Sequence, residues 1–203
     1  MFFKIVYKMG ALEKLLMTEK DFLEFEREAT EKHQFIKGEV FAMSGASIPH
    51  NVIAINVTGE VINKLKGKKC RPFGSDLRIY NPASSQYTYP DLSIICGKIE
   101  TTDDKFDTVT NPTVLFEILS PSTRNYDLGS KFELYRQIPS LKNYVTIDSQ
   151  AICVILWTKN DDKSWLMIEK KSLDESIFIE SIDVLLKLSS IYEEVNLDKS
   201  LDA

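Results

Sequence analysis

The fold of this chain is decided by one stretch of sequence, Thr113-Val114-Leu115-Phe116-Glu117-Ile118-Leu119. Apart from its glutamate, the stretch is a short apolar run, which is typical of a β-strand buried on both faces of a sheet. A carboxylate in such a strand either takes up a proton, because burial raises its pKa, or is paired with a cation. Glu117 therefore predicts both a covered central strand and a chemical site on that strand.

A second acid, Asp91, follows Pro90 and begins another apolar run, Leu92–Cys96. Side chains alternate along a strand, so Asp91 and Glu117 converge if their strands are neighbours in a suitable register. At about 4 Å the two charges would repel by roughly 4 kcal/mol at an effective dielectric constant near 20. A shared divalent cation turns this repulsion into attraction, and oxygen ligands favour Mg²⁺ or Mn²⁺. We therefore predict that Asp91 and Glu117 bind Mg²⁺ or Mn²⁺.

A lysine is the natural third member of such a site. A helix is predicted over 126–137, with a buried stripe formed by Leu128, Phe132 and Tyr135. Lys131 flanks this stripe, because it lies three residues from Leu128 and four from Tyr135, and it can reach back toward the strand. Its ammonium could orient an attacking water or stabilise charge that develops on a phosphoryl group.

Two structural interpretations of the same residues remain open. Asp91 could merely shape the turn after Pro90. Glu117 could form a buried ion pair with Lys131 or with Arg124, in which case it would stabilise the fold and take no part in chemistry.

Composition is that of one compact domain with a sizeable core: 203 residues, of which 43% are hydrophobic and 27% charged. The net charge of −5 argues against a domain that coats nucleic acid nonspecifically, although it does not exclude a nuclease. No segment approaches 18 uninterrupted apolar residues, so no membrane span is expected. We interpret the three cysteines, Cys70, Cys96 and Cys153, as buried reduced thiols, and we expect a cytoplasmic location.

The periodicity of apolar residues predicts one α/β domain with a mixed central β-sheet flanked by helices. Thr18 is the expected N-cap of a first helix, and a hairpin over 34–43 is expected to turn at Lys37-Gly38. An amphipathic helix is predicted from Pro49 to Leu65, with a buried stripe of Val52, Ile55, Gly59, Ile62 and Leu65. Further strands are expected at 69–73 and 76–80, and an antiparallel C-terminal meander at 144–147, 152–158 and 165–170.

An ordered set of motifs resembles the Uma2 family, also called DUF820, of the PD-(D/E)XK restriction-endonuclease-like superfamily. The motifs are Tyr89-Pro90-Asp91, then Phe116-Glu117-Ile118-Leu119-Ser120-Pro121-Ser122-Thr123, then Asp127-(x)3-Lys131-(x)3-Tyr135. The resemblance extends from about Thr18 to Tyr192 and ends with Leu188-Ser189-Ser190-Ile191-Tyr192. It implies a restriction-endonuclease-like core over 18–195, with an N-terminal extension over 1–17 and a C-terminal tail over 196–203.

The resemblance also assigns roles. It implies that Asp91 and Glu117 bind metal, and that Lys131 replaces the lysine that the parent pattern has at position 119, where this chain has leucine. Glu39, within Gly38-Glu39-Val40, could bond Lys131 or a metal-bound water. Asp76 is either a further metal ligand or a turn residue, and His50 is either a helix cap, a surface residue or a catalytic group.

These expectations converge on a Mg²⁺-dependent endonuclease that hydrolyses phosphodiester bonds in DNA. One alternative is a catalytically silent relative that acts as a dimerisation or regulatory binding module, and a homodimer is left open in either case. Another is a metal-dependent hydrolase of a small phosphate ester. Arg124, Lys131 and Arg136 could form a basic patch facing a nucleic-acid backbone, or could simply be solvated.

Overall fold

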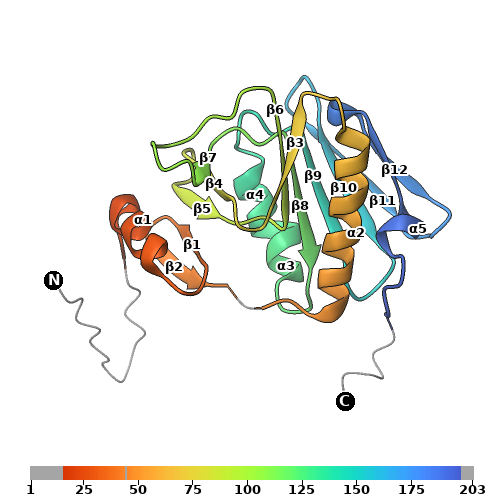
Figure 1. Cartoon of the computed structure of the whole chain (residues 1–203), viewed down its shortest axis with the longest axis horizontal. Helices are drawn as coiled ribbons and strands as arrows, with labels where there is room; N and C mark the ends of the chain where they lie inside the picture. Colours follow the sequence, from red (N-terminus) through yellow and green to blue (C-terminus); the bar gives the residue numbers. More distant parts are fainter. Residues whose placement is uncertain (1–15, 44, 198–203) are drawn as a thin grey trace, which may run out of the picture.

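The computed structural model describes residues 16–43 and 45–197 (Figure 1). The predicted central strand is β8 (Val114–Leu119), and all six of its residues are buried. It lies inside a six-stranded sheet of order β11-β10-β9-β8-β6-β3. The sheet is mixed, as predicted, because β8 runs parallel to β9 and antiparallel to β6. The other members are β3 (Cys70–Gly74), β6 (Leu92–Cys96), β9 (Asn143–Asp148), β10 (Val154–Lys159) and β11 (Trp165–Lys170).

A second sheet has five strands, in the order β2-β1-β5-β4-β7, so the strands do not all join one central sheet. Lys37 and Gly38 both have positive φ, 50° and 94°, as a two-residue hairpin turn requires, and the predicted hairpin is confirmed. Residues 16–17 adjoin this turn, since the Met17 N–H donates to the Gly38 carbonyl. The strands are β1 (His33–Ile36), β2 (Glu39–Ala42), β4 (Arg78–Asn81), β5 (Gln86–Thr88) and β7 (Thr108–Val109).

The first helix, α1 (Glu19–Glu28), covers the five-stranded sheet (Figure 1). It begins after Thr18, whose side chain accepts a hydrogen bond from the Asp21 N–H, so the predicted N-cap is confirmed. Phe22 packs on Phe35 and Tyr87 with ring centroids 5.0 and 5.6 Å apart. These rings form a small core separate from that of the larger sheet.

Helices cover both faces of the six-stranded sheet. α2 (Ile48–Leu65) shares a core with Phe116 and Ile118, whereas the helical segment after β8 shares one with Leu115. That segment comprises α3 (Arg124–Tyr126), a π-helical turn (Asp127–Lys131) and α4 (Phe132–Tyr135). The burial of β8 on both faces follows from this arrangement.

The boundaries predicted for α2 are confirmed, but its predicted buried stripe is wrong. α2 begins after the N-cap Ser47, and Gly67 follows its end with a φ of 79°. Ile55 and Ile62 are 73% and 46% exposed. Leu65 is buried as predicted, but the other residues of α2 that are buried against the sheet are Ile53, Val57 and Val61. α2 carries two apolar stripes, and its sequence does not reveal which of them meets the sheet.

The C-terminal meander is confirmed, since β10 is antiparallel to both β9 and β11. It is followed by elements that the sequence analysis did not predict: β12 (Ser176–Ile179), a 3₁₀ turn (Glu180–Ile182), β13 (Val184–Lys187) and α5 (Leu188–Ile191). These pack into the same core as α2. No helix within residues 16–43 and 45–197 is long and apolar enough to cross a bilayer.

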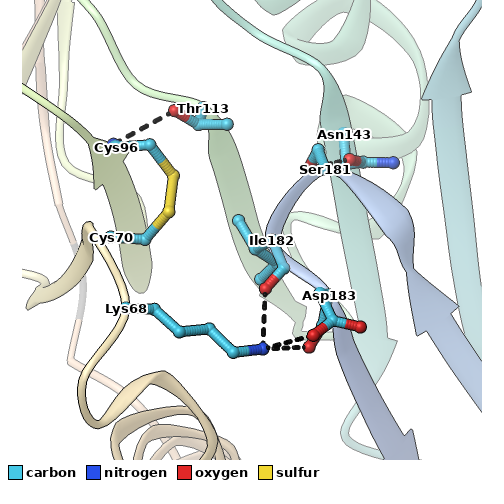
Figure 2. Close-up of a disulfide and its surroundings, with 8 residues drawn as sticks. All are labelled: Lys68, Cys70, Cys96, Thr113, Asn143, Ser181, Ile182 and Asp183. Atoms are coloured by element: carbon cyan, nitrogen blue, oxygen red, sulfur yellow. Dashed lines mark hydrogen bonds and ion pairs between the residues drawn. A yellow bond between two sulfur atoms is a disulfide. The ribbon is translucent and has the colours of Figure 1, made fainter.

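The expectation of three reduced thiols is wrong, because Cys70 and Cys96 form a disulfide between β3 and β6 (Figure 2). The antiparallel register places Cys70 directly opposite Cys96, which a separation of 26 residues in sequence does not reveal. Cys153 alone is a free, buried thiol. A cytoplasmic location was inferred from reduced thiols, and it no longer follows from the cysteines.

Lys68, near the disulfide, forms a hydrogen bond and an ion pair with the turn between β12 and β13 (Figure 2). Its Nζ donates to the Ile182 carbonyl at 3.3 Å and lies 2.9 Å from Asp183 Oδ2. Asp183 has a φ of 52°, so the turn needs a residue in the left-handed region at this position. Asp183 is exposed and Lys68 is partly buried, and the pair connects the C-terminal hairpin to the end of α2.

Candidate active site

Glu117 lies on the face of β8 that the helical segment covers, and its side chain is only 5% exposed. Its Oε1 is 2.7 Å from Lys131 Nζ and accepts a hydrogen bond from the Tyr135 hydroxyl at 2.8 Å. The alternation of β8 and the helical spacing of Lys131 and Tyr135 therefore bring together the residues that the sequence singled out. Tyr135 was predicted as part of the helix core and of the family motif, and its hydroxyl contact with Glu117 was not foreseen.

The π-helical turn holds Lys131 in place. Asp127 Oδ1 lies 3.1 Å from Lys131 Nζ, and both side chains are less than a tenth exposed. The ammonium also lies 5.9 Å from the Tyr126 ring centroid and 5.8 Å from that of Tyr135, within the range of cation–π attraction. π-helical turns are rare and recur at functional sites, because they displace side chains from regular helical positions.

Burial and neighbouring charges determine the protonation of this cluster. Burial raises the pKa of Glu117 to about 8 against the opposing charge of Lys131, while Asp91 and Asp127 add to the rise. Burial alone would lower the pKa of Lys131, but Glu117 and Asp127 outweigh it and hold that pKa above its ordinary value. Lys131 therefore stays charged at neutral pH, and Glu117 holds a proton to a higher pH than an ordinary glutamate does.

Asp91 stands directly before β6. Leu92 is opposite Phe116 in the antiparallel register, and one further step along both strands places Asp91 opposite Glu117. Asp91 Oδ2 accepts a hydrogen bond from the Ile118 N–H at 2.7 Å, so the carboxylate does more than shape a turn. Its side chain is 21% exposed, which leaves this side of the site open to solvent.

His50 joins the site from the first turn of α2. Its Nε2 lies 3.1 Å from Asp91 Oδ1, while its Nδ1 is buried and has no hydrogen-bond partner within the described residues. The Ser47 side chain, not that of His50, caps the helix, and the His50 side chain is only 14% exposed. The cap and surface interpretations of His50 are therefore wrong. The helix N-terminus is close to β6 only in the folded chain, so local sequence carried no signal for this contact.

Two other predicted site residues lie elsewhere. Asp76 is in the turn before β4, is 97% exposed and pairs with Lys32 at 2.8 Å, which is the geometry of a turn residue. Glu39 begins β2 opposite Ile36, next to the hairpin turn. The described ion-pair partners of Lys131 are carboxylates of its own helix and of β8, so a bond between Glu39 and Lys131 stays a prediction.

The proposed basic patch is not formed. Lys131 is buried, Arg124 forms an ion pair with Asp148, and Arg136 pairs with Glu133 at 3.2 Å. Of the two ion-pair partners predicted for Glu117, Arg124 pairs with Asp148, and Lys131 is the one that contacts Glu117. Two surface hollows, one between α4 and the β10–β11 hairpin that Glu133 and Arg136 help to line and one beside α1, do not include Glu117, Lys131 or Asp91 among their lining residues.

The site therefore combines three carboxyl groups, Asp91, Glu117 and Asp127, with one lysine and one histidine. Within residues 16–43 and 45–197, no three His, Cys, Asp or Glu side chains are arranged as a ready-made metal cage. Mg²⁺ does not require one, since it is commonly bound through one or two carboxylates and keeps several waters.

Comparison with known proteins shows the family to which the chain belongs. The sequence model of the Uma2 family, described as "Putative restriction endonuclease", matches residues 19–188. The chain belongs to the Uma2 family. The match contains Asp91, Glu117, Lys131 and His50, and it extends through the C-terminal hairpin.

Two relatives come from Synechocystis sp. (strain ATCC 27184 / PCC 6803 / Kazusa), and both are described as uncharacterized proteins. One is 34% identical over 176 residues, which cover 87% of this Uma2 chain and 91% of the relative. The other is 35% identical over 154 residues, which cover 76% and 87%. A crystal structure described as a putative nuclease belonging to DUF820, from Anabaena variabilis ATCC 29413, superposes with a TM-score of 0.74. That alignment covers 89% of this chain and 99% of the other at 16% identity, so the two share the nuclease-like fold.

Proposed function

We propose that this Uma2 protein is a Mg²⁺-dependent endonuclease that hydrolyses phosphodiester bonds in DNA. One observation carries the proposal: Asp91 stands directly before β6, where the antiparallel register extends to the position opposite Glu117 of β8, and the ammonium of Lys131 lies 2.7 Å from Glu117. Two acids and a lysine in a site that is open on one side suit the hydrolysis of a phosphodiester, whose transition state is anionic. The family description supports nuclease activity in general.

The donor set fits a hard divalent cation. Asp91 and Glu117 offer carboxylate oxygens, and burial together with the charges of Asp91 and Asp127 raises the pKa of Glu117 to about 8. Oxygen donors of this kind favour Mg²⁺ or Mn²⁺ over zinc. When bound, the cation would supply Lewis-acid stabilisation of the phosphate oxygens and lower the pKa of a coordinated water.

The chain's own residues would orient the reacting groups. The Ile118 N–H and His50 Nε2 each hold one oxygen of Asp91, so the carboxylate is fixed before substrate arrives. Asp127 holds Lys131, whose ammonium could stabilise the charge on the phosphoryl group as water attacks and the P–O bond breaks. His50 acts through Asp91 and is therefore a positioning residue in this scheme.

A silent module is the second candidate, and a specific observation favours it. Lys131 already contacts both Glu117 and Asp127 in a cluster with side chains no more than 8% exposed. Such a cluster can serve as a buried structural ion pair without any chemistry. The protein would then use the nuclease fold for binding or assembly.

Nicking of supercoiled plasmid DNA separates the two functions. The parent protein should nick DNA with Mg²⁺ or Mn²⁺ and not with excess EDTA, and Glu117→Gln should remove the activity. Asp76→Asn is the matched control, because Asp76 is an exposed carboxylate outside the cluster and should be dispensable. A parent that never cuts, while its melting temperature is insensitive to both metals, would establish the silent module.

A further inference from the structure

The surface hollow between α4 and the β10–β11 hairpin has a volume of about 460 Å³. Lys159 follows the core residue Trp157 by two positions on β10, so both side chains lie on the face of the sheet that the helical segment covers. Trp165 is opposite Lys159 in the register of β10 and β11 and lies on the same face. The lining includes these two residues, the cations Arg136 and Lys163, and one carboxylate, Glu133.

The lining of this hollow is positively charged, although the chain has a net charge of −5. The lining carboxylate, Glu133, already pairs with Arg136 at 3.2 Å. Within residues 16–43 and 45–197, no carboxylate lies within ion-pair distance of Lys159, of Lys163 or of the adjacent Lys142. The hollow therefore gathers lysine charges that the described chain does not neutralise.

The lysines of the hollow also act on one another. Burial lowers the pKa of Lys159, and the charges of Lys142 and Lys163 lower it further. Asp161 and Asp162, in the same hairpin turn as Lys163, are not among the lining residues. Because a negatively charged ligand would relieve the repulsion among the lysines, the hollow is complementary to an anion.

An aromatic ring adjoins these charges. The Lys159 Nζ lies 6.0 Å from the ring centroid of Trp165, which packs edge-on against Phe132 with centroids 5.3 Å apart. Trp165 is thus held by the core and is still partly exposed. Cations for the phosphates and an aromatic ring for the bases are the features by which proteins bind single-stranded nucleic acid. An acidic peptide would use the lysines but would have no base to place against Trp165.

We propose that this hollow binds an unpaired nucleic-acid strand, whose phosphates contact Lys159 and Lys163 and one of whose bases stacks on Trp165. The choice of a nucleic acid rests in part on the proposed function, whereas the preference for an anion rests on the charges of the hollow alone. Arg136 adds a further cation at the rim, which it shares with Glu133.

The hollow is separate from the candidate active site, although both lie on the same face of the sheet. Glu117 is opposite Thr146 on β9, and Lys159 on β10 donates its N–H to the carbonyl of Lys142, four residues before Thr146. Four residues along and two strands across amount to roughly 16 Å, at about 3.3 Å per residue and about 4.8 Å per strand. The hollow would therefore add affinity for a strand without taking part in the chemistry.

Fluorescence anisotropy with a labelled oligothymidylate tests the proposal on the full chain in EDTA, where binding is measured without cleavage. The parent should bind, and the double substitution Lys159→Gln and Lys163→Gln should weaken binding at low salt by about tenfold or more. It should also reduce the slope of log Kd against log salt concentration by about 1.4, because each lost phosphate contact contributes about 0.7. Lys20→Gln is the matched control, because Lys20 is an exposed lysine on α1 that pairs with Glu24, and it should change neither quantity.

Trp165→Leu separates stacking from charge. It should weaken binding by about tenfold without changing the salt slope, because it removes one base–aromatic contact and no cation. It should also abolish the quenching of tryptophan fluorescence by the oligonucleotide, since the remaining Trp157 is buried. Trp165→Phe keeps an aromatic ring and should retain most of the affinity. Circular dichroism confirms that each variant is folded.

A parent that does not bind oligothymidylate, or binding that the lysine and tryptophan substitutions leave unchanged, would overturn the proposal. Binding of polyglutamate that depends on the lysines but not on Trp165 would also overturn it, in favour of an acidic peptide. Nicking with Mg²⁺ decides the proposed function separately. A parent that nicks DNA while its lysine variant binds normally refutes only the role of the hollow, whereas a parent that binds through the hollow and never nicks refutes only the endonuclease.

Discussion

Replacing Lys131 by methionine tests the buried cluster most directly. The ammonium lies 2.7 Å from Glu117 and 3.1 Å from Asp127, and all three side chains are at most 8% exposed. Methionine keeps much of the volume but leaves Asp127 in the core without its cation, while Glu117, whose pKa is about 8, stays largely neutral. Removing one partner of a buried pair typically costs about 3–5 kcal/mol, against about 0–1 kcal/mol for an exposed pair. We therefore expect Lys131→Met to lose about 3–5 kcal/mol of unfolding free energy at pH 7 without metal.

Urea denaturation in EDTA measures this loss, and Lys68→Met is the matched control. Lys68 makes the same kind of contact with Asp183, but Asp183 is 79% exposed, so the identical substitution should cost about 1 kcal/mol or less. The nicking rate is measured in parallel at a temperature where the variant is folded. Loss of one preorganised charge should lower that rate by roughly 10²–10³. Stability of Lys131→Met equal to that of the parent would refute the description of the cluster as a buried ion pair.

Three further outcomes are expected. Mg²⁺ or Mn²⁺ at a hundredfold excess over Kd should stabilise the parent by about 2.7 kcal/mol, and Asp91→Asn should abolish the gain; equal melting shifts in both would place the metal elsewhere. Because the pKa of Glu117 rises from 4.5 to about 8 on folding, its contribution to stability is greatest below pH 4.5 and is lost as pH rises to about 8. The unfolding free energy of the parent relative to Glu117→Gln should therefore fall between pH 5 and pH 8, and a constant difference in urea titrations would contradict the shift. Thiol titration of the unreduced, denatured protein should detect one free cysteine, Cys153, and detection of three would exclude the Cys70–Cys96 disulfide.

The local sequence predicted those elements of the fold that depend on the chemistry of neighbouring residues. The continuous apolar run around Glu117 predicted a strand covered on both faces, because a strand with one exposed face has polar residues at alternate positions. Lys37-Gly38 predicted a hairpin because its turn needs positive φ, and Thr18 predicted a helix start because its hydroxyl caps a free N–H. The hairpin of β12 and β13 had a weaker sequence signal, the alternation of the buried residues Ile177 and Ile179. This signal was missed because β12 is a short strand.

Long-range placement decided the rest of the candidate site. The alternation of a strand and the period of a helix predicted Asp91, Glu117 and Lys131 as one site only on the condition that the strands of Asp91 and Glu117 are neighbours in a suitable register. Only the tertiary structure brought His50 to Asp91, left Asp76 in an exposed turn and placed Cys70 opposite Cys96. It also chose which of the two apolar stripes of α2 faces the sheet. The physical reason is that periodicity shows which residues share a face, whereas strand order and register show which faces meet.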